Sequence, residues 1–316
     1  MLFKNSVKIL LSNFNIVWKM ALYFIVVFAL CIAGLYFLIS PILEIIGEAG
    51  FFSQIIDLYS DFLSNLNLTE ALETLSQILD NLFAFVVENI SQLWFYFIGI
   101  AILIFFINFI LFNLSNMASC MSLHLYIGSM TKQSFFASFS ENFGKNLKFQ
   151  LCNFLVTFPF NFLYVGLFVL TLKLFGISFF LDIIALLVIV VGLVALIALK
   201  NSIFVAWLPS MVVMNYGVFK SLKLGIKTVF KRFGRVFGCM VGYVITILVL
   251  NLSVGLFTLM TGLIISIPIS FLLYNVIGMV VIYEGQGMRY YVDVYNVVTP
   301  QKKEITDKLK DMKYIV

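Results

Sequence analysis

Long apolar stretches alternate along the chain with shorter segments that mix apolar and charged residues. Each long stretch is predicted to be a membrane-spanning helix, because about 20 consecutive apolar residues cross the hydrocarbon core of a bilayer. The approximate bounds of these stretches are 20–40, 93–127, 149–172, 179–214, 237–258 and 263–283. The pattern predicts an all-α fold, that of a polytopic membrane protein with six transmembrane helices.

The segment 215–243 is the clearest of the mixed segments. On a helix that turns about 100° per residue, its basic residues gather on one side and its apolar residues on the other. The basic residues are Lys220, Lys223, Lys227, Lys231 and Arg235, and the apolar ones are Val218, Phe219, Leu222, Ile226, Val229, Phe230 and Phe233. The pattern is typical of an amphipathic helix in the membrane interface. The basic residues are candidate contacts for anionic lipid headgroups, or they serve only to anchor the helix.

A row of glycines follows this amphipathic segment. Gly234, Gly238 and Gly242 recur at intervals of four residues where the next apolar stretch begins. Small residues at this spacing let a second helix approach the backbone closely. We therefore expect helix packing on these three glycines.

Similar basic segments precede apolar hairpins near residues 1, 131 and 215. Residues 136–139 (FASF) align with residues 219–222 (FKSL), and residues 3–6 (FKNS) are a weaker match. This pattern predicts a threefold internal repeat, with three cytoplasmic interfacial amphipathic helices that form a collar around the spans.

Residues 41–91 differ from the rest of the chain, because they carry acidic residues and no Lys or Arg. The acidic residues are Glu44, Glu48, Asp57, Asp61, Glu70, Glu73, Asp80 and Glu88. Asn67 followed by Glu70 is a signal for the start of a helix. We expect an external helical hairpin with a turn near 65–69, whose second helix runs on into the next span. The hairpin is a possible binding surface for a protein partner.

Basic residues set the predicted orientation, since cytoplasmic loops are rich in Lys and Arg. They gather in 1–19, 129–148, 215–235 and 284–316, whereas the loops on the opposite side hold only Lys173. Both termini of this multi-pass protein of the cell membrane are therefore predicted to be cytoplasmic. The predicted order is an interfacial helix and span at 1–40, an external acidic hairpin at 41–92, a second span at 93–130, an interfacial helix with two spans at 131–214, an interfacial helix with two spans at 215–283, and a cytoplasmic tail at 284–316.

Composition supports the membrane class. Of the 316 residues, 62% are hydrophobic and 11% are charged, whereas about a quarter of the residues in globular domains are charged. The net charge of +5 does not indicate nucleic-acid binding, because the basic residues flank apolar spans. The abundance of Phe, Ile, Asn and Lys is typical of an AT-rich genome and suggests the cytoplasmic membrane of a bacterium.

Motifs of known chemistry are missing from the sequence. The four cysteines form no CxxC pair, and His124 is the single histidine, so neither a disulfide framework nor a multi-histidine metal site is supported. The Gly-rich turn at 284–287 is not followed by the GK[ST] of a phosphate loop. We predict no catalytic residues, no cofactor, no metal and no enzymatic activity.

Polar residues recur at helical spacing within several spans. Two rows are the strongest, one on the second span and one on the third: Asn113, Asn116, Cys120 and His124, and Asn153, Thr157, Asn161 and Tyr164. Such rows are expected to face the interior of a bundle, where they form interhelical hydrogen bonds. The alternative is a polar cavity for a small solute or lipid headgroup, with Asn113, Asn116, His124, Asn153, Thr157 and Asn161 as candidate lining residues.

The segment 203–242 resembles part of a known family. It has an apolar stretch that ends near Pro209, a turn at Gly217, and an amphipathic helix with Ser221 and Lys223. In this order it is similar to the membrane domain of glycerophosphoryl diester phosphodiesterases and related uncharacterised six-span bacterial membrane proteins. The resemblance, which includes Arg235 and covers the last third of the chain best, implies a fold. It implies no activity, because the phosphodiesterase chemistry of that family resides in a separate soluble domain.

A second match lies near the C-terminus. The family often ends its last span with a Tyr-Tyr-Asp-Leu-Arg-like element, and Tyr290-Tyr291-Val292-Asp293 is similar. Val292 interrupts the pattern, and no Arg follows.

Two functions fit the sequence. The first is a non-enzymatic membrane scaffold or accessory subunit that binds membrane lipids or protein partners. The second is a transporter or lipid-handling protein with a polar cavity between the second, third and sixth spans.

Overall fold

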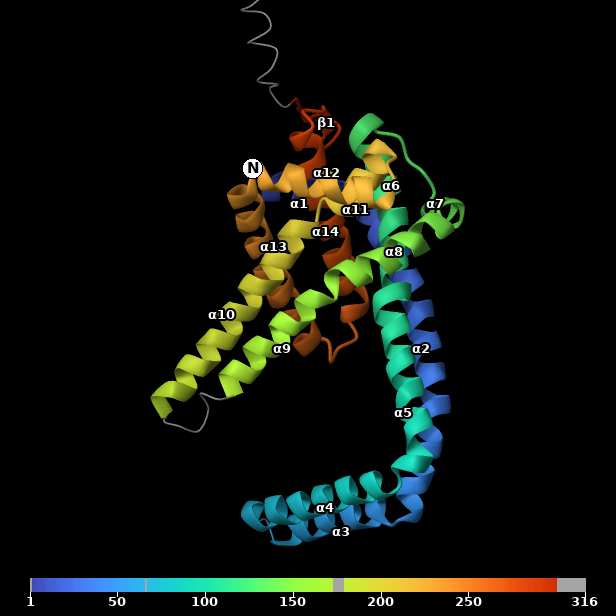
Figure 1. Ribbon diagram of the computed structural model, residues 1–316, viewed down its shortest axis with the longest axis vertical. Coiled ribbons are helices and arrows are strands. Elements are labelled where there is room, and N and C mark those ends of the chain that lie inside the picture. The colour runs from blue at the N-terminus through green and yellow to red at the C-terminus, as the bar shows by residue number, and fades with distance from the viewer. Residues whose placement is uncertain (1, 66, 173–178, 300–316) are drawn as a thin grey trace, which may run out of the picture. The chain divides into compact units, whose positions relative to one another are not determined.

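The chain is helical along most of its length (Figure 1). The computed structural model describes residues 2–65, 67–172 and 179–299. It divides into two compact units, Met1–Ile25 with Phe112–Val316 and, separately, Val26–Leu111. The predicted all-α class is confirmed. Within the described part, the strands β1 (Tyr290–Tyr291) and β2 (Val297–Val298) pair in an antiparallel ladder.

Several helices are long and apolar enough to cross a membrane. They are Phe14–Glu48, Phe143–Val169, Leu187–Met214, Phe233–Phe257 and Leu263–Gly285. A sixth is added if the bent pair Glu70–Glu88 and Ile90–Phe105 counts as one span. The described residues thus hold five or six candidate spans, and the predicted polytopic membrane class is confirmed.

The first unit contains most of the helices. They are α1 (Leu2–Ser12), the start of α2 (Phe14–Glu48), α6 (Phe112–Ser129), α7 (Phe135–Glu141), α8 (Phe143–Thr157), α9 (Pro159–Leu172), α10 (Phe179–Phe204), α11 (Trp207–Met214), α12 (Val218–Phe230), α13 (Phe233–Phe257) and α14 (Leu263–Gly285).

Three of these helices form the centre of the first unit. α6, α11 and α14 each pack against the other two. Most of α14 from Leu272 onward is buried. Gly278 permits a close approach, because a Cβ at this position would lie 2.7 Å from Cγ of Pro209 in α11. The centre is therefore a packed three-helix core.

The short amphipathic helix at the start of each predicted repeat packs on one central helix. α1 packs on α14, α7 on α6, and α12 on α11 (Figure 1). Each of the three helices buries a serine completely: Ser6, Ser138 and Ser221 all have 0% exposure. Because the side chain of serine is small, the helix axes can come close together. The pairing of α1 with α14 joins the first repeat to the last.

At two of the three junctions between a short helix and the helix that follows it, an asparagine side chain makes the same hydrogen bond. Asn13, between α1 and α2, donates its side-chain amide to the carbonyl oxygen of Ile9 at 2.8 Å. Asn142, between α7 and α8, donates in the same way to Ser138 at 3.1 Å. An asparagine that bonds to a carbonyl four residues earlier competes with the helix, which explains the break at each junction.

The second unit holds the rest of α2 and the helices α3 (Phe51–Asn65), α4 (Leu68–Glu88), α5 (Ile90–Phe105) and η1, a π-helix (Phe106–Leu111). α2 and α5 touch at Gly34, beside Leu103, and at Gly99, beside Leu38. α3 and α4 form the predicted hairpin (Figure 1).

The predicted start of α4 is confirmed, but its predicted end is wrong. The Asn67 side chain accepts a hydrogen bond from the backbone N–H of Glu70. α4 does not run on into the next span: it is bent by 96° from α5. Asn89 lies at the bend, and its side-chain amide donates to the carbonyl oxygen of Phe85 at 2.9 Å. The helix therefore ends at Glu88.

Candidate functional site

α12 is fixed to the core by hydrogen bonds from α11. The indole Nε1 of Trp207 donates to the carbonyl oxygen of Val218 at 2.9 Å. The Ser210 hydroxyl donates to the carbonyl oxygen of Ser221 at 2.7 Å. The chain reverses between the two helices at Asn215, which takes the left-handed conformation (φ 49°, ψ 40°) that asparagine tolerates well. These contacts hold one side of α12 in place.

The side of α12 that faces the core consists largely of small side chains. Ser221, Gly225, Thr228 and Val229 are buried. A Cβ at Gly225 would lie 3.0 Å from the backbone of Ala206. The core-facing side therefore differs from the apolar side that the sequence pattern predicts, and shares Val229 with it.

Two large apolar residues of α12 point outward instead. Phe219 is 69% exposed and Phe230 is 58% exposed. Lys220, Lys223 and Lys227 are exposed on another side of the helix, as is Lys231 just after it. α12 therefore has three sides, one that packs on the core, one apolar and exposed, and one basic and exposed. This is the arrangement of a helix in a membrane interface whose third side is held by protein.

The other two short helices and the segments beside them show parts of this layout. Phe136 of α7 and Phe143 of α8 are exposed, and so is Leu11 of α1. The lysines near them are exposed as well: Lys4, Lys8, Lys132, Lys145 and Lys148. We call the exposed sides of α1, α7 and α12, with their flanking lysines, the collar surface.

Arg235 differs from the lysines of α12. Its Nη1 lies 3.1 Å from Oε2 of Glu284, and Nη1 of Arg232 lies 3.4 Å from the same oxygen. Arg235, predicted as a candidate headgroup contact, thus also forms an ion pair within the chain through its guanidinium. Its side chain is still 46% exposed.

Glu284 is the centre of a polar cluster that the sequence patterns did not reveal. Its carboxylate is buried at the end of α14 and accepts a hydrogen bond from the Tyr290 hydroxyl at 3.0 Å. The Asn5 side chain donates to the same hydroxyl at 3.1 Å. Burial raises the pKa of Tyr290 to about 12. The cluster joins α1, α13, α14 and β1, and an acidic residue directly after a span was the available signal.

A small cavity of about 10 Å³ lies beside this cluster, lined by Leu2, Thr228, Arg232, Arg235, Val236, Val281 and Glu284. Its volume is close to that of a single water molecule. It is too small for a lipid headgroup.

Among the described residues, no side chain or backbone packs on the glycine row of α13. A Cβ at Gly234, Gly238 or Gly242 would meet no atom within 4 Å. The predicted helix packing on these glycines is therefore not made by the described part of the chain. Close approaches to the backbone of another segment occur at Gly225 and Gly278, which lie outside the regular row.

The polar row on α6 is hydrogen-bonded to α14. Asn275 donates to Oδ1 of Asn116 at 3.0 Å and to the Ser119 hydroxyl at 2.8 Å. Asn116 in turn donates to Oδ1 of Asn113 at 3.0 Å. Asn275 was missed in the sequence because it stands alone in an apolar run. These contacts are the interhelical bonds expected of polar residues in spans.

α8 supplies further bonds where α6 follows the π-helix η1. Asn146 donates to the carbonyl oxygen of Leu114, and Gln150 donates to that of Asn113 at 2.9 Å. A π-helix interrupts the regular helical ladder, and side chains of neighbouring helices commonly satisfy the carbonyls near such a break. The two amide side chains therefore stabilise the start of α6.

The remaining predicted polar residues are dispersed. His124 Nδ1 and the Tyr283 hydroxyl are joined by a hydrogen bond of 2.8 Å. Asn153 is half-buried and Thr157 is buried. The side chain of Asn161 lies outside the described residues. Among the candidate residues, the structure connects Asn113 directly to Asn116.

The residues that carry the family resemblance have structural positions. Pro209 of α11 lies against Gly278 of α14, Ser221 lies in the contact of α11 with α12, and Gly217 precedes α12. Asp293 accepts hydrogen bonds from the backbone N–H groups of Tyr295 and Asn296, and so forms the turn between β1 and β2.

Comparison with known proteins gives no relative. No family model matches the chain, and neither a curated protein nor a solved structure matches it. Within the described ranges, no group of three or more His, Cys, Asp or Glu residues is arranged to hold a metal ion.

Proposed function

We propose that the protein is a non-enzymatic membrane scaffold or accessory subunit whose collar surface binds anionic lipid headgroups at the cytoplasmic face of the membrane. The single observation that carries this proposal is the three-sided arrangement of α12. Its lysines and its exposed phenylalanines lie on neighbouring sides, while the third side is fixed to the core.

The energies expected for this surface are sufficient for selective binding. Each lysine near an anionic membrane surface contributes about 1 kcal/mol. Each phenylalanine that enters the acyl region contributes about 1.5–3 kcal/mol. α12 offers Lys220, Lys223 and Lys227 together with Phe219 and Phe230, so electrostatic and apolar binding reinforce each other.

The rigid attachment of α12 favours binding. Free amphipathic peptides lose conformational entropy when they fold on a membrane. Here the bonds of Trp207 and Ser210 hold the helix before any lipid binds. A preorganised surface avoids that cost.

The direct bonds between α6 and α14 favour a scaffold over a transporter. Asn116, Ser119 and Asn275 are buried and bonded to one another. These polar groups bond to one another between the helices, which is the role of packing residues and not that of residues lining a cavity.

Electron spin resonance of labelled lipids tests the proposal. The purified chain is reconstituted in phosphatidylcholine that contains either spin-labelled phosphatidylglycerol or spin-labelled phosphatidylcholine. We expect the wild type to select phosphatidylglycerol, and the variant K220Q/K223Q/K227Q to lose most of that selectivity.

A matched variant controls for net charge. K302Q/K303Q/K308Q removes three lysines from the C-terminal tail and should keep the selectivity of the wild type. Equal selectivity in all three proteins, or an equal loss in both variants, would contradict the proposal.

A further inference from the structure

The hairpin of α3 and α4 exposes a row of apolar side chains on each helix. On α3 the row is Phe52, Ile55, Ile56, Tyr59 and Leu63, and on α4 it is Leu72, Leu75, Leu79, Phe83 and Val87. A soluble protein seldom exposes so many neighbouring apolar side chains, and a surface of this kind marks a binding site for lipid or protein.

The two rows lie on the same side of the hairpin. Phe51 of α3 and Ile78 of α4 are buried, and the Phe51 ring lies 5.4 Å from that of Phe85, which identifies the sides that face each other. In both helices the exposed apolar row is displaced by about 100° from the facing side in the same rotational sense. Because the helices are antiparallel, this displacement brings both rows to one face.

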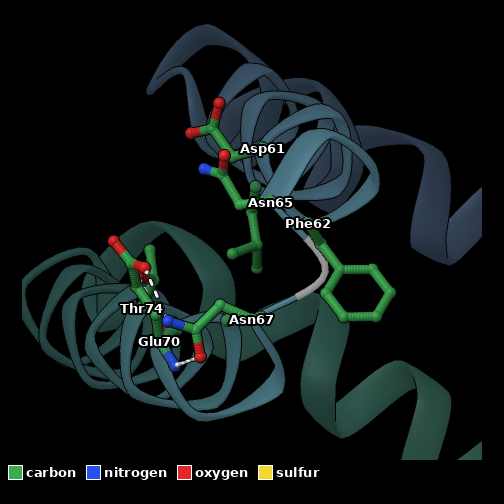
Figure 2. Close-up of a pocket in the computed structure, with 8 residues that line it drawn as sticks. Asp61, Phe62, Asn65, Asn67, Glu70 and Thr74 are labelled. Carbon is green, nitrogen blue, oxygen red and sulfur yellow. Dashed lines mark hydrogen bonds between the residues drawn. The ribbon is translucent and has the colours of Figure 1, made fainter.

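The opposite face of the hairpin is polar and acidic. A pocket of about 80 Å³ lies between the helices there, lined by Leu58, Asp61, Phe62, Asn65, Asn67, Glu70, Ala71 and Thr74. Figure 2 shows Asp61 and Asn65 on the α3 side of this pocket and Asn67 and Glu70 on the α4 side. The hairpin therefore has one apolar face and one acidic face.

The bend at Asn89 sets the direction of the hairpin relative to α5. α4 is inclined by 96° to α5. α5 is apolar and continues directly into η1. Together the two helices are roughly 30 Å long, enough to cross the hydrocarbon core. If α5 crosses the bilayer, α4 lies parallel to the membrane plane, and α3, packed along it, does as well.

The apolar face is turned toward the end of α2. The Phe52 ring, in the apolar row, lies against the last turn of α2, where a Cβ at Gly47 would be 3.3 Å from it. Phe52 is therefore on the inner side of the corner between α2 and α3. The inner side of this corner is the side on which the bilayer lies.

The start of α5 marks the level of the membrane interface. Trp94 is exposed there, about one turn after the bend, and tryptophan is enriched at the boundary between lipid and water. Exposed apolar side chains also lie on both sides of the bend, at Val87 of α4 and at Ile90 of α5. The apolar face of the hairpin is thus continuous with the lipid-facing surface of a span.

We propose that the α3–α4 hairpin lies in the membrane interface, with its apolar face among the acyl chains and its acidic face toward water. The occupant of the apolar face is the bilayer that α5 crosses. The acidic residues do not oppose this position, because they point away from the lipid. The hairpin then enlarges the area that the protein covers at the membrane interface.

Depth-dependent fluorescence quenching tests this position. Single cysteines are introduced by Ile56→Cys and Phe83→Cys on the apolar face and by Asp57→Cys and Glu73→Cys as matched positions on the acidic face. Each variant is labelled with NBD and reconstituted in phosphatidylcholine. The wild type, treated identically, gives the background from the four native cysteines.

We expect doxyl-labelled lipid to quench the probes at positions 56 and 83 several-fold more than aqueous iodide does. The order should reverse at positions 57 and 73. If one apolar-face variant does not yield folded protein, Ile55→Cys or Leu79→Cys replaces it on the same row.

Two results would overturn the proposal. Strong iodide quenching at all four positions would mean that the hairpin projects into water. Shielding of positions 56 and 83 from both quenchers would mean that a second copy of the chain covers the apolar face. Neither result affects the lipid selectivity of the collar surface, which is measured separately.

Discussion

Gly278 of α14 lies against the carbonyl oxygen of Val205, so closely that a Cβ at Gly278 would clash with that oxygen. Val205 stands between α10 and α11, and the contact fixes how near α11 comes to α14. Glycine is required at this position by space and not by a special backbone angle.

Gly278→Ala should therefore destabilise the protein. The added methyl group forces α14 away from α11, and overpacking of this kind costs about 1–3 kcal/mol. Thermal unfolding of the purified protein in detergent should show a clear fall in the midpoint temperature.

Gly238→Ala is the matched control, because a Cβ at Gly238 meets nothing within 4 Å. Alanine is the better helix former, so the stability should stay equal or rise by up to about 1 kcal/mol. A fall as large as that of Gly278→Ala would show that α13 packs on its glycine row after all.

Asn275 provides a second test of the core. Asn275→Leu leaves the side chains of Asn116 and Ser119 without their partner from α14. Buried polar groups that lose a partner cost about 1–3 kcal/mol. Unfolding should be measured for Asn275→Leu, for Asn116→Leu and for the double variant.

The double variant should be more stable than the sum of the two single effects predicts, since both polar groups are then gone. A coupling energy of about 0.5–2 kcal/mol is expected. Strict additivity would show that the two side chains do not interact.

The sequence predicted the helical class and the candidate spans because hydrophobicity in long stretches is a local property. The turn at Asn67 was also local, since its bond to Glu70 spans three residues. The bend at Asn89 was missed, because the apolar pattern continues across it and only one side-chain bond marks it.

The candidate sites were less predictable, because they depend on contacts between distant residues. The row at Gly234–Gly242 looked like a packing surface, yet the close approaches fall at isolated glycines whose neighbours lie on other helices. Glu284 meets Arg232 across 52 positions of sequence. No local pattern encodes such a pair.

The hydroxyl of Tyr290 predicts a dependence of stability on alkaline pH. Burial raises its pKa from 10.0 in the free side chain to about 12 in the fold. The neutral form is the one that the fold favours, so this contribution is complete below pH 10 and is lost as the pH rises through 12.

The test compares the wild type with Tyr290→Phe in urea or thermal unfolding at pH 8, 10, 11 and 12. Other titrating groups are common to both proteins and cancel in the difference. The wild type should lose its advantage over Tyr290→Phe between pH 10 and 12. A constant difference across this range would contradict the shift.

Glu284→Gln tests the charge at the centre of the polar cluster. Glutamine has the size of glutamate and can still accept the hydrogen bond of Tyr290, but Arg232 and Arg235 then lose the carboxylate between them. Ion pairs with half-exposed partners contribute about 0.2–1 kcal/mol each, so the unfolding midpoint in detergent should fall slightly.

The double variant Glu284→Gln with Arg235→Gln should recover part of this loss, because one unpaired guanidinium is removed. Both arginines are nearly half exposed, so added salt should reduce the difference between wild type and Glu284→Gln by screening. Asp80→Asn, which neutralises an exposed carboxylate of α4, should have the same unfolding midpoint as the wild type. If Glu284→Gln also unfolded at the temperature of the wild type, the pairing with the two arginines would contribute nothing to the stability of the fold.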